Sequence, residues 1–98
     1  MIRNVVVGTV NEGVDPVEVE NALQALRDLR VEGVEFTLLA GQDLGLREGN
    51  AQYVLTADFA DEDAYRVYDA DGEHNRIRRE RFAPISASIS RIQFRLPD

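Results

Sequence analysis

Two residues with the chemistry of proton transfer lie close together in the second half of the chain. His74 is the only histidine, and an imidazole changes its charge near neutral pH without a large pKa shift. Tyr68 precedes it by six residues and carries a phenol that can donate a hydrogen bond. Between helices and a sheet, such a pair can polarise a carbonyl and move a proton. A lone histidine at a helix start also serves as a structural hydrogen-bond partner, so both interpretations stay open.

A group of arginines follows this pair, and its members lie close together in the sequence: Arg76, Arg78, Arg79 and Arg81. They indicate either an anion-binding site or a solvated helix face that balances Glu73 and Glu80. The single histidine and the scattered carboxylates show no ligand spacing, so we expect no metal site.

The composition narrows the classes of function. The formal net charge of −7 repels phosphate backbones, so we expect neither a nucleic acid nor a membrane surface as partner. The chain has no cysteine, which excludes disulfides, thiolate nucleophiles and cysteine-ligated metals. No apolar run approaches the ~18 residues of a membrane span, and the N-terminus lacks a signal-peptide pattern. Together these features predict a cytoplasmic protein.

The elements that must position these residues follow from hydrophobic periodicity and capping signals. We expect strands at residues 2–10, 33–40, 51–60 and 85–96, and a loop at residues 41–50. We expect helices from Pro16 to about Arg30, from Asp61 to a break at Gly72, and over residues 73–83. The order β-α-β-β-α-β predicts one α+β domain over residues 1–98. It is the ferredoxin-like pattern, an antiparallel four-stranded sheet with helices on one face.

Apolar residues on both faces of the first strand predict that the other face of the sheet is covered as well. Val5, Val6 and Val7 are consecutive, so both faces of this strand are apolar. In the last strand the apolar face changes near Ser90–Arg91, which predicts either a bulge there or a strand that leaves the sheet for another surface. We expect the apolar residues beyond it to contact a partner subunit or the rim of a barrel: Ile92, Phe94 and Leu96.

The opening strand IRNVVVGTV, the helix after it and the stretch QYVLTADFADEDAYRVYDADGEHNRIRRERFAPI resemble the stress-responsive dimeric α/β-barrel family. A Y-x-L-x-x-x-F strand leads through an acidic helix cap to Y-x-x-x-x-x-H, a short helix, a proline and the last strand. The resemblance covers nearly the whole chain. It implies a homodimer in which two protomers pair their open sheet faces into one barrel.

The family contains plant stress proteins, many bacterial members without known activity, and a polyketide cyclase. In the cyclase, a histidine on the first strand acts with a tyrosine and a second histidine in an aldol condensation. Tyr68 and His74 match the latter two and are the candidate catalytic residues. The strand position is Asn4 here, and an amide cannot take the proton. The resemblance implies that the ligand pocket is lined by Asn4, Val6, Ala22, Leu23 and Leu26.

These observations predict a homodimeric barrel protein of the stress-response type that binds a small apolar or aromatic ligand and needs no cofactor. The alternative is a cofactor-free enzyme, similar to the cyclase or to small monooxygenases, that uses His74 and Tyr68. A third class is an assembly module whose pocket is filled by its own side chains. A cavity lined by Asn4, Tyr68 and His74 would favour the first two classes over the third.

Overall fold

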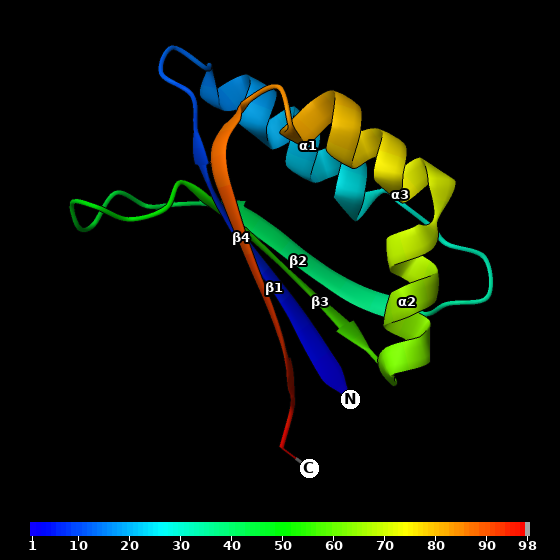
Figure 1. Ribbon diagram of the computed structural model, residues 1–98. Helices are drawn as coiled ribbons and strands as arrows, with labels where there is room; N and C mark the ends of the chain where they lie inside the picture. The colour runs from blue at the N-terminus through cyan, green and yellow to red at the C-terminus, as the bar shows by residue number, and fades with distance from the viewer. Residues whose placement is uncertain (98) are drawn as a thin grey trace.

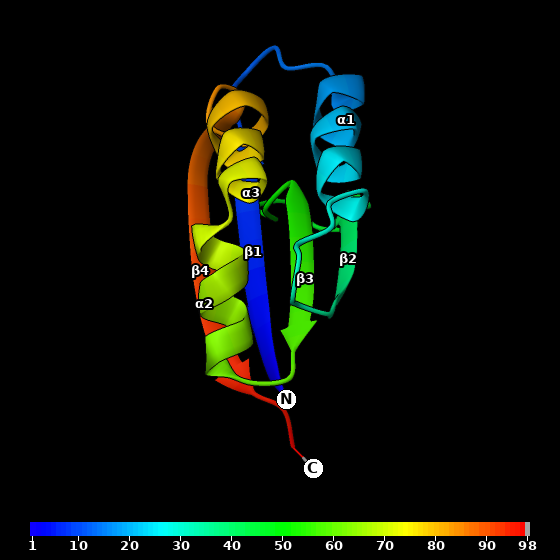
Figure 2. The same cartoon turned by 90° about the vertical axis from the view of Figure 1, so that its right-hand side faces the viewer.

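The computed structural model describes residues 1–97, which form one antiparallel sheet with helices on one face (Figures 1 and 2). The strand order is β2-β3-β1-β4, so β1 lies inside the sheet and β2 and β4 lie at its edges. The elements are β1 Ile2–Val10, α1 Pro16–Arg27, β2 Phe36–Gln42, β3 Tyr53–Phe59, α2 Glu62–Ala70, α3 Gly72–Ile77, the π-helical turn η1 Arg78–Phe82, and β4 Ser86–Arg95. This architecture confirms the predicted α+β, ferredoxin-like fold.

Helix α1 begins where the sequence predicts. The Asp15 side chain accepts a hydrogen bond from the backbone N–H of Val17, and Pro16 occupies the first turn. The helix ends at Arg27, earlier than the predicted Arg30, and Asp28 caps it. Leu29 lies outside the helix but remains buried in the core, so hydrophobic spacing alone placed the helix end too late.

Two predicted boundaries are wrong for local backbone reasons. Strand β2 begins at Phe36 rather than at residue 33, because Val31 and Val34 form a bridge across a turn with Gly33 at a φ of +81°. The break between α2 and α3 lies at Asp71, whose extended backbone ends one helix. Its carboxylate then accepts the N–H of His74 and begins the next helix, so Gly72 is the first residue of α3.

The irregularity in β4 lies nearer to its start than predicted. Ser88 pairs with Thr9 and Ser86 pairs with Val10, so one extra residue, Ala87, is inserted there. Ser90 and Arg91, where we predicted the bulge, are paired regularly with β1. The bulge changes which side chains face the helices, and from there on the odd-numbered residues of β4 face the helix layer.

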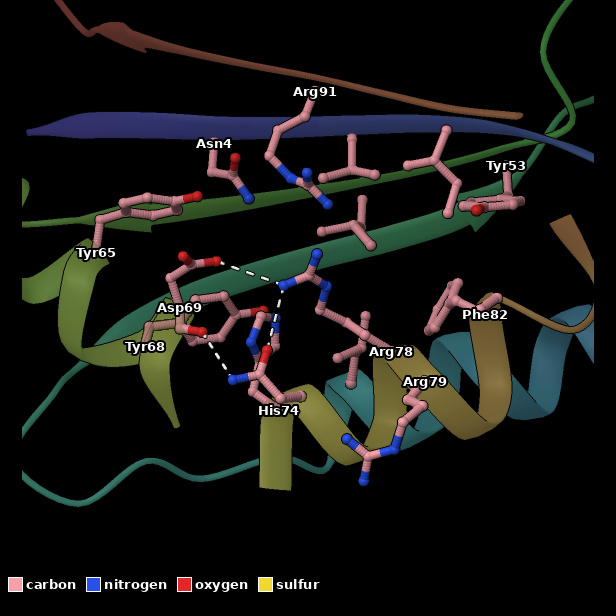
Figure 3. Close-up of a pocket in the computed structure, with 16 residues that line it drawn as sticks. Asn4, Tyr53, Tyr65, Tyr68, Asp69, His74, Arg78, Arg79, Phe82 and Arg91 are labelled. Atoms are coloured by element: carbon pink, nitrogen blue, oxygen red, sulfur yellow. Dashed lines mark hydrogen bonds and ion pairs between the residues drawn. The ribbon is translucent and has the colours of Figure 1, made fainter. Parts of the chain in front are cut away.

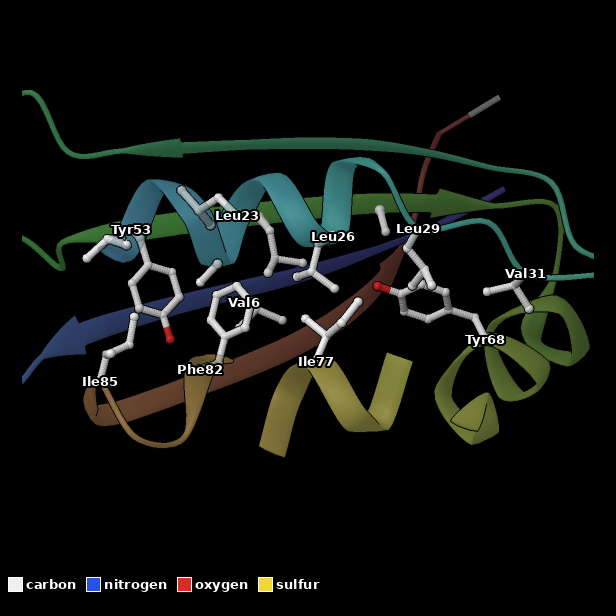
Figure 4. Close-up of a cluster of buried hydrophobic side chains, with 14 of the residues drawn as sticks. Val6, Leu23, Leu26, Leu29, Val31, Tyr53, Tyr68, Ile77, Phe82 and Ile85 are labelled. Carbon is white, nitrogen blue, oxygen red and sulfur yellow. The ribbon is translucent and has the colours of Figure 1, made fainter. Parts of the chain in front are cut away.

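The hydrophobic core fills the space between the helix layer and the sheet (Figure 4). Its largest fully buried side chains are Tyr53, Tyr68, Phe59 and Leu23. The core holds α1 and the α3–η1 segment against the sheet, and so fixes the positions of the residues discussed below. None of the helices in residues 1–97 is long and apolar enough to cross a membrane.

The helices lie on one side of the sheet (Figure 1), and the opposite side carries exposed apolar side chains. Leu39 is 66% exposed and Ile92 is 63% exposed, which is unusual for strand residues of this size. We call this surface the open face and define it by six residues from all four strands: Val5, Val7, Leu39, Val54, Ile92 and Phe94.

Candidate functional site

A cavity of about 550 Å³ lies between the helix side of the sheet and the α2–α3–η1 segment (Figure 3). Five residues of the predicted site line it: Asn4, Val6, Leu26, Tyr68 and His74. Ala22 and Leu23 do not line it. They are 1% and 0% exposed and belong to the hydrophobic core, because this part of α1 packs directly against other core side chains.

Tyr68 and His74 form one rigid pair in the wall of this cavity. Their ring centroids are 4.1 Å apart, although the residues belong to different helices. The Tyr68 ring also packs edge-on against Phe36 and at a tilt against Phe59, with centroids 5.0 Å away in each case. The side chains of Tyr68 and His74 are 1% and 6% exposed, so neither can adopt many rotamers.

One polar atom of each ring has no partner in the part of the chain that the structure describes. The hydroxyl of Tyr68 and Nδ1 of His74 are buried without a hydrogen bond. Each such group costs roughly 1–3 kcal/mol, so two together are unusual in a purely structural contact. Other groups bridge the helix break. The N–H of His74 donates to Asp71 at 2.9 Å, and the Asn75 side chain donates to the carbonyl of Asp69 at 3.1 Å.

Both rings are uncharged near neutral pH. Burial lowers the pKa of His74, the nearby charge of Arg78 lowers it further, and Asp69 opposes this shift. Burial raises the pKa of Tyr68 far above its usual value. The cavity wall therefore presents an imidazole that can accept a proton beside a phenol that can donate a hydrogen bond.

We expect acidification to destabilise the wild type more than His74→Gln. The pKa of His74 is lower in the folded chain than its unfolded value of about 6.5, so the unfolded chain binds the proton more readily. The stability from neutral His74 is present above this value and is lost as the pH falls towards the folded pKa. Urea unfolding of both proteins at about pH 7.5 and about pH 5.5 measures the effect, because carboxylate titrations common to both cancel in the difference. An identical pH dependence would contradict the burial argument.

Asn4 is buried at 3% exposure and is oriented by the neighbouring strand. Gln93 pairs with it across β1 and β4 and donates from Nε2 to its Oδ1 at 2.7 Å. The same Nε2 lies 3.4 Å from the hydroxyl of Tyr65. Because the amide oxygen of Asn4 is engaged, its NH₂ group is directed into the cavity as a donor (Figure 3).

The arginine group divides between two roles. Arg76 forms ion pairs with Glu73 and Glu80 on the outer surface, as expected for a solvated helix face. Arg78 instead borders the cavity, where it donates to Asn75 at 3.2 Å and lies 3.6 Å from Asp69.

Sequence reasoning missed Arg91, which lines the cavity, and Gln93, which lies outside the lining but holds the Asn4 side chain. Our predictions for the last strand concerned its apolar residues, whereas the side that faces the helices carries Ile89, Arg91 and Gln93. The alternation of polar residues at positions 91, 93 and 95 was the available signal.

The layered sheet, with a cavity of about 550 Å³ under its helices, defines a ferredoxin-like domain. The chain belongs to the stress responsive A/B barrel domain (Dabb) family, whose model matches residues 2–95. A comparison with curated protein sequences gives no match.

Solved structures similar to this chain include proteins with and without a known activity. A dimeric ferredoxin-like protein of unknown function from Thermobifida fusca is 31% identical, with a TM-score of 0.86 over 97% of this chain and 90% of that one. A hydroxynitrile lyase from Passiflora edulis is 13% identical, with a TM-score of 0.82 over 99% of this chain and 94% of that one. A cofactor-independent oxygenase from Streptomyces nogalater is 24% identical, with a TM-score of 0.71 over 99% and 93%. The latter two likenesses concern the fold alone.

Proposed function

We propose that this protein is a homodimer that binds one small aromatic or apolar molecule per protomer in the cavity beside Tyr68 and His74. The cavity carries this proposal. Its volume of about 550 Å³ lies within the ~300–1,000 Å³ of small-molecule sites. Val6, Leu55 and Phe82 supply apolar wall, while the Tyr68–His74 pair supplies polar atoms without partners. This combination supports ligand binding over an assembly module whose pocket is filled by its own side chains.

The open face supports the homodimer. It crosses all four strands and is apolar at its centre, as expected of a surface that a second copy covers. At one end of this face, Arg3 and Asp58 form a bidentate ion pair with hydrogen bonds of 2.7 and 2.9 Å. An apolar centre with a polar edge is the usual anatomy of a protein interface. The similar protein from Thermobifida fusca is dimeric.

Binding of 2-naphthol tests the cavity directly. The chain has no tryptophan, so the fluorescence of a bound naphthol has little protein background. Ala83 borders the cavity, and we expect Ala83→Phe to weaken binding more than tenfold by filling the space. Ala70→Phe is the matched control, because Ala70 is exposed at the end of α2 and does not line the cavity. No saturable binding by the wild type would overturn the proposal.

A second candidate function is acid–base catalysis without a cofactor. One observation favours it: a buried neutral imidazole lies against a buried phenol, both with unpartnered polar atoms. In this function His74 removes a proton from carbon next to a carbonyl, and Tyr68 donates a hydrogen bond to the carbonyl oxygen, where negative charge develops. The fold is shared with a hydroxynitrile lyase and a cofactor-independent oxygenase.

Hydrogen–deuterium exchange at the acidic carbon of 2-tetralone tests this second function. We expect the wild type to accelerate exchange, and His74→Gln to reduce the acceleration by about a hundredfold while 2-naphthol still binds. Tyr68→Phe should also reduce it. Exchange no faster than in buffer would leave ligand binding alone as the function.

A further inference from the structure

We propose that the ligand of this cavity is an aromatic carboxylic acid whose carboxylate is held between Arg78 and Arg91, an inference that rests on the proposed ligand-binding function. The two arginines reach the cavity from opposite walls (Figure 3). Arg78 comes from η1 on the helix layer, and Arg91 comes from the helix side of β4, where it pairs with Val6.

The charge at the cavity is opposite to that of the whole chain. The protein has a formal net charge of −7, yet the cavity is lined by three arginines and one carboxylate, that of Asp69. Arg79 borders the cavity but directs its guanidinium away from it (Figure 3). Arg78 and Arg91 are therefore the two cations that face the space a ligand would occupy.

Arg91 is available for a ligand. Within residues 1–97 no carboxylate lies within ion-pair distance of it, although the chain has more acids than bases. Its neighbour Arg95, also on the helix side of β4, pairs with Glu62 at 3.0 Å. Arg78 forms an ion pair with Asp69 at the longer distance of 3.6 Å. A planar guanidinium without a protein carboxylate is suited to an anion with the same fork geometry.

The uncharged polar groups of the cavity also favour an anionic ligand. The NH₂ of Asn4 is turned towards the cavity by Gln93, and the Tyr68 hydroxyl is without an acceptor. Both arginines act electrostatically on the Tyr68 phenol, where each partly offsets the effect of burial on its pKa. Donors and positive charge thus meet at one site, which favours an electron-rich ligand over a neutral hydrocarbon.

The experiment compares 2-naphthoate with 2-naphthamide, which has the same ring and a similar shape without the charge. We expect the wild type to bind naphthoate about tenfold more tightly, and the preference to decrease with added salt. We expect Arg91→Gln to weaken naphthoate binding at least fivefold and to leave naphthamide binding unchanged. Arg78→Gln should act in the same direction. Arg95→Gln is the control, because it removes a charge from the same strand outside this cavity.

The outcomes separate this inference from the proposed function. Equal binding of the two probes, or naphthoate binding unaffected by Arg91→Gln, would overturn the carboxylate site while the cavity still binds a neutral aromatic. If neither probe binds and 2-naphthol also fails, the proposed function itself is overturned. A charge preference that is lost equally in Arg95→Gln would reflect general electrostatics, and would also overturn the specific site.

Discussion

Val5→Asp is expected to abolish the dimer, while Val17→Asp leaves it intact. The wild type should sediment at micromolar concentration with roughly twice the protomer mass of 11.0 kDa. The Val5→Asp protein should sediment as a protomer or lose its cooperative fold. This is the largest effect that we predict for any single substitution on assembly.

The position of Val5 explains the size of the effect. It lies on β1 inside the sheet, between Thr56 of β3 and Ile92 of β4, at the centre of the open face. A second copy on this face would remove a carboxylate at position 5 from water, among the apolar side chains of the open face. An unpaired buried charge costs several kcal/mol, which exceeds what a dimer of small protomers can absorb.

The control, Val17→Asp, makes the same substitution of valine by aspartate on a different surface of the protein. Val17 is 62% exposed on α1, on the helix layer and away from the open face, so aspartate there stays in water. Analytical ultracentrifugation of the three proteins at the same concentration gives the result. A Val5→Asp protein that still sediments as a dimer would show that the copies associate through another surface.

The element order and the uncovered face could be predicted because their signals are local. Consecutive valines in the first strand showed two apolar faces, and Asp15 with Pro16 showed a helix start. The start of β2 and the bulge at Ala87 could not be predicted. They depend on a turn bridged by Val31 and Val34 and on the register between β4 and β1, which residue types alone do not reveal.

The site residues also fall into those that could be identified from the sequence and those that could not. Residue chemistry singled out Tyr68 and His74, the resemblance added Asn4, and the fold brings these three to one cavity. Arg91 and Gln93 were missed because their position facing the helices follows from the register of β4.

Gly8→Ala is expected to be the most destabilising of the conservative substitutions. A Cβ at position 8 would lie 2.1 Å from Cζ and 2.3 Å from the hydroxyl oxygen of Tyr53, which faces it across β1 and β3. Contacts this short do not persist, so the ring or the strand must move. Overpacking of this kind costs about 1–3 kcal/mol and occasionally more. That corresponds to a loss of about 10 °C in Tm for a domain of this size.

The Tyr53 ring has little freedom to yield. It is 2% exposed, its hydroxyl exchanges a 2.8 Å hydrogen bond with Ser86, and its ring packs against Phe82 at a centroid distance of 5.6 Å. Tyr53 and Phe82 also line the cavity, so a displaced ring would enter the space for the ligand. We therefore expect Gly8→Ala to weaken 2-naphthol binding as well as to lower Tm.

Gly41→Ala is the matched control for Gly8→Ala. Gly41 also lies within a strand, β2, its φ is not positive, and a Cβ there would meet no atom within 4 Å. Alanine at this position should change Tm by only a few degrees in either direction, since it removes some freedom from the unfolded chain. In a Gly8→Ala background, Tyr53→Leu should cost less than it does alone, because the smaller side chain relieves the clash. Additive effects of the two substitutions, or an unchanged Tm for Gly8→Ala, would mean that the Tyr53 ring is not held over Gly8.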